Sequence, residues 1–135
     1  MIGLDTGFFV ELLRKNLEAV EVWQGIIEGD DSTVSCLTLY ELKRLSLRGV
    51  IDSEAVSTLL EAIGGICKIV WFDKTEILTA AATISQSYGI HAIDSLIIAG
   101  LTSSKVKKIY TTDSHMKKYK RKGVSIINMM AGFRS

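Results

Sequence analysis

The sequence predicts an α/β protein whose parallel sheet is covered by helices on both faces. Short apolar or β-branched stretches alternate with helical patterns along the chain, and no hairpin-turn signal joins neighbouring strands. Parallel strands need helical crossovers, so this alternation places helices on both sides of the sheet. The 135 residues are 47% hydrophobic and contain no repeat or linker, which predicts a single domain over residues 1–135.

The first half of the chain contains two predicted strands and four predicted helices. Apolar side chains recur at helical spacing in each helix, and Asn16 is the expected cap of the second one. Gly49 is expected to end the third helix, and the pair Gly64-Gly65 the fourth. The expected ranges are strand 1–4, helix 6–15, helix 17–28, strand 33–36, helix 38–48 and helix 53–63.

The second half of the chain contains three predicted strands and three predicted helices. Asp73 is the expected cap of a long helix that Gly89 stops. The next helix is apolar nearly all the way round, which predicts that it is buried in the core. The expected ranges are strand 67–71, helix 73–88, helix 92–103, strand 108–111, helix 114–120 and strand 124–127.

Charge is distributed unevenly, although the net charge is only +1. Residues 1–104 contain 7 Lys/Arg against 14 Asp/Glu, a net of −7, whereas residues 105–135 contain 9 against 1, a net of +8. The basic end is either an ordinary solvated surface or a rim that faces a polyanion beside an acidic centre.

The two cysteines and the N-terminus bear on the compartment. Cys36 and Cys67 have neither CxxC spacing nor partner histidines, so we expect free thiols of an intracellular protein. The N-terminus lacks a basic segment, and Asp5 interrupts its apolar stretch, so no signal peptide is expected. No stretch reaches the roughly 18–20 apolar residues that cross a bilayer. We therefore expect a cytoplasmic protein with no membrane partner.

Four acidic residues fall where strands are expected to end or where helices begin. Asp5 follows the first strand and Asp113 follows the strand that ends at Thr112. Glu41 lies one turn into the helix after the second strand, and Asp94 lies near the start of the buried helix. Because parallel strands share one carboxyl edge, these side chains can converge there, where open α/β sheets bind their ligands.

Clustered carboxylates repel one another, and one of them would take up a proton unless cations neutralise the group. Mg²⁺ and Mn²⁺ prefer oxygen ligands, and such a centre can assist in-line attack on a phosphodiester. The sequence offers no GxSxG motif, no Cys-His arrangement and no phosphate-binding glycine loop that would indicate other chemistry.

A purely structural interpretation of the same acids is also open. Thr38-Leu-Tyr-Glu41 fits a capping box, in which Glu41 would only close the start of its helix. Asp5 and Asp113 could be simple N-caps, each worth about 1 kcal/mol. Asp94 is harder to explain in this way, because an ionised group at the start of an apolar helix needs a partner. Composition and spacing alone leave both interpretations standing.

Four segments together resemble the motifs of PIN domains, in the order and at the separations usual in that family. They are Ile2-Gly-Leu-Asp5-Thr6, Leu37-Thr-Leu-Tyr-Glu41-Leu, Ile93-Asp94-Ser-Leu-Ile-Ile-Ala99 and Tyr110-Thr-Thr-Asp113. The resemblance covers essentially the whole chain. It implies a three-layer α/β/α fold with a five-stranded parallel sheet in the order 3-2-1-4-5. It also implies a Mg²⁺ or Mn²⁺ site and endoribonuclease activity that prefers single-stranded RNA.

The resemblance also assigns residues and partners. The four acids, Asp5, Glu41, Asp94 and Asp113, match the family's acidic residues, and Thr6 and Thr112 match two hydroxyl residues beside them. Small members include VapC-type toxins, which implies a possible cognate antitoxin. Homodimerisation is a family expectation, for which the amphipathic helices at 17–28 and 54–63 are candidate faces, although core packing explains them equally well.

Two positions depart from the family pattern. Members often carry Asn or Ser two residues after the first acid, where this chain has Gly7. Many carry a further acid two residues after the last one, where this chain has His115. The second departure allows a single metal ion at rest or reduced activity. His115 is either a surface residue of a short helix or a contact to metal or phosphate.

The basic residues supply candidate contacts to single-stranded or structured RNA. Tyr119 among them could stack on a base or belong to the core. The candidates for binding the RNA backbone are Arg44, Lys117, Lys118, Lys120, Arg121 and Lys122.

Two other functions are open besides the ribonuclease. One is a PIN-like module that binds RNA or protein without cutting. The other is a phospho-accepting domain with Asp5 as nucleophile, which Gly7 disfavours because phosphatases of that type usually carry a second Asp there.

Overall fold

The computed structural model describes residues 1–129, so residues 130–135 of the predicted domain and of the basic segment lie outside the described residues. The described elements are β1 (Ile2–Leu4), α1 (Thr6–Leu13), α2 (Leu17–Ile27), β2 (Ser32–Ser35), α3 (Cys36–Leu47), α4 (Ser53–Ile66), β3 (Lys68–Val70), α5 (Thr75–Tyr88), α6 (Ala92–Ser103), β4 (Lys108–Thr111), the 3₁₀ helix η1 (Ser114–Lys118) and β5 (Ser125–Asn128).

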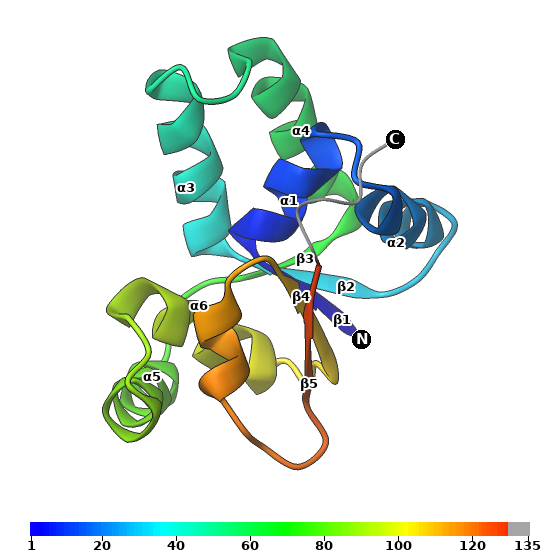
Figure 1. The fold of residues 1–135 in the computed structure, drawn as a ribbon. Helices are drawn as coiled ribbons and strands as arrows, with labels where there is room; N and C mark the ends of the chain where they lie inside the picture. The colour runs from blue at the N-terminus through cyan, green and yellow to red at the C-terminus, as the bar shows by residue number, and fades with distance from the viewer. Residues whose placement is uncertain (130–135) are drawn as a thin grey trace.

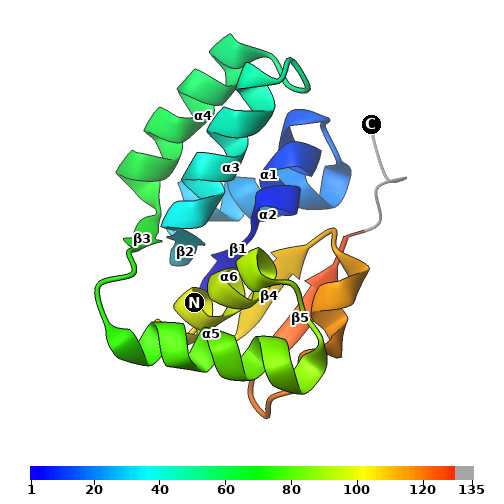
Figure 2. The same cartoon turned by 90° about the vertical axis from the view of Figure 1, so that its left-hand side faces the viewer.

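The five strands form one parallel sheet in the order β3-β2-β1-β4-β5, which confirms the predicted fold class. β1 is the central strand, and its Leu4 pairs with Val34 of β2 on one side and with Tyr110 of β4 on the other. Helices α1–α4 cover one face of the sheet, while α5, α6 and η1 cover the other (Figures 1 and 2). The arrangement is the three-layer α/β/α sandwich that the family resemblance implied.

The core beneath α1–α4 is built around two phenylalanines at the start of α1. Phe8 and Phe9 are fully buried, and their rings meet edge to face with centroids 5.1 Å apart. Phe9 also contacts Trp23 of α2 edge to face at 5.7 Å. Aromatic pairs of this geometry add about 0.5–1.5 kcal/mol beyond the area they bury. These contacts hold the first turn of α1, and with it the end of β1, against the sheet.

The other core lies between α6 and the sheet, and α6 is buried as its apolar sequence predicted. Ile97, Ile98 and Leu101 of α6 are at most 1% exposed. The preceding helix, α5, ends at Gly89, whose φ of 66° is the left-handed conformation expected of a helix-stopping glycine. The turn directs the chain back so that α6 begins at the same edge of the sheet as α1.

Three predicted element boundaries are wrong. Cys36 does not end a strand but begins α3, because the Ser35 hydroxyl accepts the Leu37 N–H at 3.1 Å and starts the helix early. Asp73 does not cap α5, whose N-cap is Lys74 with no side-chain hydrogen bond. The pair Gly64-Gly65 does not end α4 either. The helix continues through both to Ile66, since the neighbouring Ile63 is fully buried and holds the last turn in place.

Both cysteines are free thiols, as expected from their spacing; Cys36 is half-buried and Cys67 is buried. Within residues 1–129 the helices are too short or too polar to cross a membrane.

Candidate active site

Two of the predicted acids follow adjacent strands at the carboxyl edge of the sheet. Asp5 comes directly after β1 and Asp113 closely after β4, and these strands pair in parallel. Both residues are also helix N-caps: Asp5 Oδ1 accepts the Phe8 N–H at 3.0 Å, and Asp113 Oδ1 accepts the His115 N–H at 2.8 Å. Capping therefore accounts for one oxygen of each carboxyl group but not for the further side-chain hydrogen bonds that each group makes.

Asp5 is the most buried of the four acids, with 5% of its surface exposed. Burial raises the pKa of its carboxyl group from 3.8 to about 7. Hydrogen bonds from Thr111 and from the Phe8 N–H lower the pKa and oppose the effect of burial, while the charges of Asp94 and Glu41 raise it further. A carboxyl group in this state is held partly protonated near neutral pH and is ready to ionise when a positive charge approaches.

Thr111 is a site residue that the sequence did not single out. It is the last residue of β4 and is fully buried, on the same face of the sheet as Ile109. Its hydroxyl oxygen accepts the Asp113 N–H at 2.9 Å, and its proton is free to be donated to the Asp5 carboxyl group. One hydroxyl group thus joins the two acids. A buried hydroxyl at a strand end needs hydrogen-bond partners, and Thr111 has one in each acid.

Thr112, the hydroxyl residue predicted to support the site, has a different position. It packs against Gly7 so closely that a Cβ atom at residue 7 would lie 2.1 Å from the Thr112 hydroxyl oxygen. The absence of a side chain at Gly7 is therefore what makes room for Thr112. At residue 7, where the chain departs from the family pattern, glycine leaves the space that the Thr112 side chain occupies.

Glu41 reaches the site from α3, and the capping-box interpretation is wrong for it. The N-cap of α3 is Ser35, so Glu41 lies well inside the helix and does not close its start. The Thr6 hydroxyl donates to Glu41 Oε1 at 2.5 Å, and the hydroxyl oxygens of Thr6 and Thr38 lie 3.2 Å apart. Thr6, predicted to support the site, thus orients a carboxylate of a different helix.

Asp94 connects the remaining acids. Its pKa is raised from 3.8 to about 6, first by burial and then by a side-chain hydrogen bond with Asp113 and the charges of Asp113 and Glu41. His91, the N-cap of α6, lowers the pKa again. The structure therefore brings all four predicted acids into one interacting group: Asp5 follows β1, Asp113 follows β4, and Glu41 and Asp94 lie on α3 and α6.

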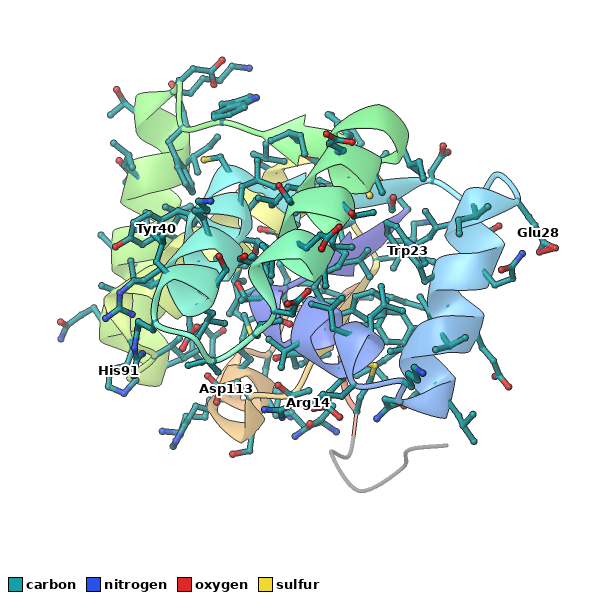
Figure 3. The ribbon with its side chains drawn as sticks, turned by 90° about the horizontal axis from the view of Figure 1, so that it is seen from above. Arg14, Trp23, Glu28, Tyr40, His91 and Asp113 are labelled. Atoms are coloured by element: carbon teal, nitrogen blue, oxygen red, sulfur yellow. The ribbon has the colours of Figure 1, made fainter. Side chains whose placement is uncertain are left out.

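Two histidines flank this acidic cluster, which we define as Asp5, Glu41, Asp94 and Asp113. The rings of His91 and His115 meet edge to face with their centroids 6.3 Å apart, and both side chains are exposed. Figure 3 shows His91 and Asp113 on the same side of the molecule, with Trp23 on the other.

The cluster is not a formed metal site. Within residues 1–129, no three His, Cys, Asp or Glu side chains are placed to hold one ion. Glu41 is turned toward Thr6, and Asp5 toward the Phe8 N–H, so these oxygens are engaged within the protein. The donor set itself, four carboxyl groups, is of the kind that Mg²⁺ and Mn²⁺ prefer. Burial, and after it the neighbouring carboxyl groups, raise the pKa values of Asp5 and Asp94, and a cation would offset both effects.

The structure separates the basic residues that were grouped by sequence. Lys117 and Lys118 lie on η1 directly after Asp113, and Arg44 is exposed in the last turn of α3. In contrast, Tyr119 is 6% exposed and packs edge to face on Tyr88 at 5.5 Å, so it belongs to the core and is not available to stack on a base.

Lys120, Arg121 and Lys122 form the turn before β5. Because Ser125 pairs with Lys108, this turn lies at the amino edge of the sheet, away from Asp113.

The sequence profile of PIN domains matches residues 2–122 of this chain, which include all four acids. The chain belongs to the PIN domain family. PIN domains are nucleases that generally use divalent metal ions. A comparison with the sequences of curated proteins found no match.

Several solved structures share this fold. One is a toxin–antitoxin complex from Klebsiella pneumoniae, with a TM-score of 0.71 and 14% identity, covering 92% of this chain and 95% of that one. Another is VapBC2 from Rickettsia felis bound to a promoter DNA fragment, with a TM-score of 0.71 and 17% identity over 96% and 100% of the two chains. A third is Mycobacterium tuberculosis VapC20, described as a sarcin-ricin loop cleaving toxin, with a TM-score of 0.62 and 16% identity over 87% and 93%.

Proposed function

We propose that this PIN protein is a metal-dependent endoribonuclease that cleaves phosphodiester bonds of single-stranded RNA. The observation that carries the proposal is the acidic cluster, in which four carboxyl groups from distant parts of the sequence interact and two have raised pKa values. Groups held in this way cost folding free energy, and perturbed carboxyl groups at the ligand-binding edge of a sheet are typical of functional sites. Because the PIN domain family consists of nucleases, the reaction that we assign to the cluster is cleavage of phosphodiester bonds.

We assign Asp5, Glu41, Asp94 and Asp113 as the catalytic and metal-binding residues, with Mg²⁺ or Mn²⁺ as the cation. When bound there, the cation supplies positive charge that stabilises the phosphodiester during attack and acidifies the attacking water. Binding requires that Asp5 and Asp94 lose their protons.

The hydroxyl groups around the cluster act as positioning groups in this proposal. The Thr111 hydroxyl group holds Asp5 and Asp113 next to each other through its two hydrogen bonds. Thr6 holds Glu41 on the side of α3 that faces Asp5. Preorganised carboxylates lose less conformational entropy when they bind an ion or a substrate.

We further propose that the protein is the toxin of a toxin–antitoxin pair, with a cognate antitoxin as partner. This proposal is supported by the fold it shares with chains of toxin–antitoxin complexes. Homodimerisation belongs to the same proposal, with α2 and α4 as candidate faces. Exposed Leu17, Val20 and Ile27 of α2, which are 53%, 42% and 52% exposed, support the assignment of α2 as such a face.

A second function, a PIN scaffold that binds RNA or protein without cutting, is favoured by two observations. No three potential ligands in residues 1–129 are placed to share an ion, and His115 stands where many members have an acid. A titration of Mn²⁺ against labelled single-stranded RNA separates the two functions. The nuclease cuts RNA in proportion to metal occupancy, and Asp94→Asn folds normally but does not cut. RNA that stays intact at every Mn²⁺ concentration would favour the binding module, and undiminished metal-dependent cutting by Asp94→Asn would refute the site assignment.

A further inference from the structure

A second cluster of charge lies at the amino edge of the sheet, opposite the acidic cluster. Two segments meet there: the turn before β5 and the segment that leads from α6 into β4. Their backbones are joined by the Ser125 N–H, which donates to the Lys107 carbonyl oxygen at 2.8 Å. The six cations on these segments, all exposed, are Lys105, Lys107, Lys108, Lys120, Arg121 and Lys122. We refer to these six residues as the amino-edge patch.

Within residues 1–129, the amino-edge patch has no ion-pair partner, because none of its six side chains lies within 4 Å of a carboxylate. The acids at the same edge, Asp30 and Asp31, precede β2, and β1 lies between β2 and the patch. Six positive charges therefore gather on two adjacent segments without compensation, which costs electrostatic free energy unless an anion is bound.

The acidic cluster does not supply that compensation. Lys108 begins β4 and Asp113 follows its end, so five residues of extended chain separate them, or roughly 16 Å at about 3.3 Å per residue. The Debye length at physiological ionic strength is about 8 Å, so exposed charges this far apart are largely screened from each other. In Figure 1 the turn before β5 lies at the bottom of the view, whereas α1 rises from the upper edge of the sheet.

One part of the patch, the turn before β5, borders a hollow in the surface. A hollow of about 510 Å³ lies between the basic turn and β5, lined by Lys117, Lys120, Arg121, Lys122, Ser125 and Ile126. Lys117 and Lys118 of η1 are exposed and lie between Asp113 and this hollow along the chain. Exposed cations therefore follow one another along the chain from Asp113 to the amino edge, and such a series of positive charges suits the backbone of a single strand.

We propose that the amino-edge patch is a second RNA-binding surface, which holds the sugar-phosphate backbone of the substrate at a distance from the bond that is cut. The inference rests on the proposed function in one respect, that the polyanion is RNA. The proposed RNA contacts then include Lys105, Lys107 and Lys108. Lys120–Lys122 belong to this second surface and not to the RNA contacts beside the acidic cluster.

The test measures binding of a labelled single-stranded RNA in EDTA over a series of salt concentrations. The variants are Lys107→Gln/Lys108→Gln and Lys120→Gln/Lys122→Gln. The matched control is Lys68→Gln/Lys74→Gln, which also removes two exposed charges but at the β3 edge. Each phosphate contact on a single strand contributes about 0.7 to the slope of log K against log salt, so each patch variant should bind RNA more weakly and lose up to about 1.4 of slope. The control should keep the wild-type slope.

Equal slopes in the patch variants, the control and the wild type would overturn the proposal. The proposal would also be overturned if the patch binds an acidic protein. RNA binding would then be unchanged in the patch variants, and poly-glutamate would bind to the wild type but not to the patch variants. Binding in EDTA does not depend on cutting. A wild type that binds RNA through the patch but leaves it intact in Mn²⁺ therefore refutes the nuclease and supports the patch. A wild type that cuts RNA, with equal salt slopes in the wild type and the patch variants, supports the nuclease and refutes the patch.

Discussion

Removal of the buried charge at Asp5 should change how the stability of the metal-free protein depends on pH. The carboxyl group is 5% exposed, and its pKa is raised from 3.8 to about 7, chiefly by burial. The folded protein therefore binds this proton more tightly than the unfolded chain does. The resulting stabilisation is fully present below about pH 4 and is lost as the pH rises through about 7. Asn at this position cannot ionise, and its side-chain oxygen can still accept the Phe8 N–H.

The size of the effect follows from the pKa shift. At about 1.4 kcal/mol per pKa unit, a shift from 3.8 to about 7 corresponds to roughly 4 kcal/mol of unfolding free energy lost across that range. Part of the shift comes from the charges of Asp94 and Glu41, so 4 kcal/mol is an upper bound for Asp5 alone. Asp5→Asn should remove most of this loss.

Urea unfolding in EDTA at about pH 5 and about pH 8 measures the effect directly. The wild type should lose up to about 2.5 kcal/mol more than Asp5→Asn between the two pH values, because part of the full loss already occurs below pH 5. Asp31→Asn, which changes an exposed acid at the amino edge, is the control and should behave as the wild type. Parallel pH dependence in the wild type and Asp5→Asn would refute the reasoning, because it would mean that Asp5 is already ionised at low pH.

Three further substitutions test the local geometry. Thr111→Val should cost about 1–3 kcal/mol in thermal unfolding, because the Asp113 N–H loses its acceptor and Asp5 a donor; an unchanged melting temperature would exclude the bridging role. Gly7→Ala should cost about 1–3 kcal/mol, because its Cβ would lie 2.1 Å from the Thr112 hydroxyl oxygen, and Thr112→Ala in the same chain should restore part of that loss. Gly64→Ala, in a helix interior with no atom within 4 Å of the new Cβ, should stabilise the protein by about 0.5–1 kcal/mol. Equal effects at Gly7 and Gly64 would contradict the close contact.

Much of the fold follows from the sequence because each strand and helix carries its own periodic pattern. The alternation of strands and helices gave the parallel sheet, and the motif resemblance gave its order. The errors lie at element ends, where a few tertiary contacts decide. Ser35 starts α3 earlier than the β-branched run suggests, and the packing of Ile63 carries α4 through two glycines that usually end a helix.

The acidic cluster was predictable for a related reason. Residues that follow parallel strands share an edge whatever the details of packing, so Asp5 and Asp113 had to lie near each other. The choice between Thr111 and Thr112 was not predictable, since it depends on which face of β4 meets the core. The position of Lys120–Lys122 was also not predictable, because it depends on the register of β5, in which Ser125 pairs with the first residue of β4.

The central claim, that the acidic cluster binds a divalent cation, is tested most directly by calorimetric titration of Mn²⁺ into the protein without RNA. The wild type should bind Mn²⁺ at about pH 8 with release of protons, and more weakly as the pH falls through the raised pKa values of Asp5 and Asp94. The Asp94→Asn variant should bind at least about tenfold more weakly. A wild type that binds no Mn²⁺, or an Asp94→Asn variant that binds it as tightly as the wild type, would show that the acidic cluster is not the metal site.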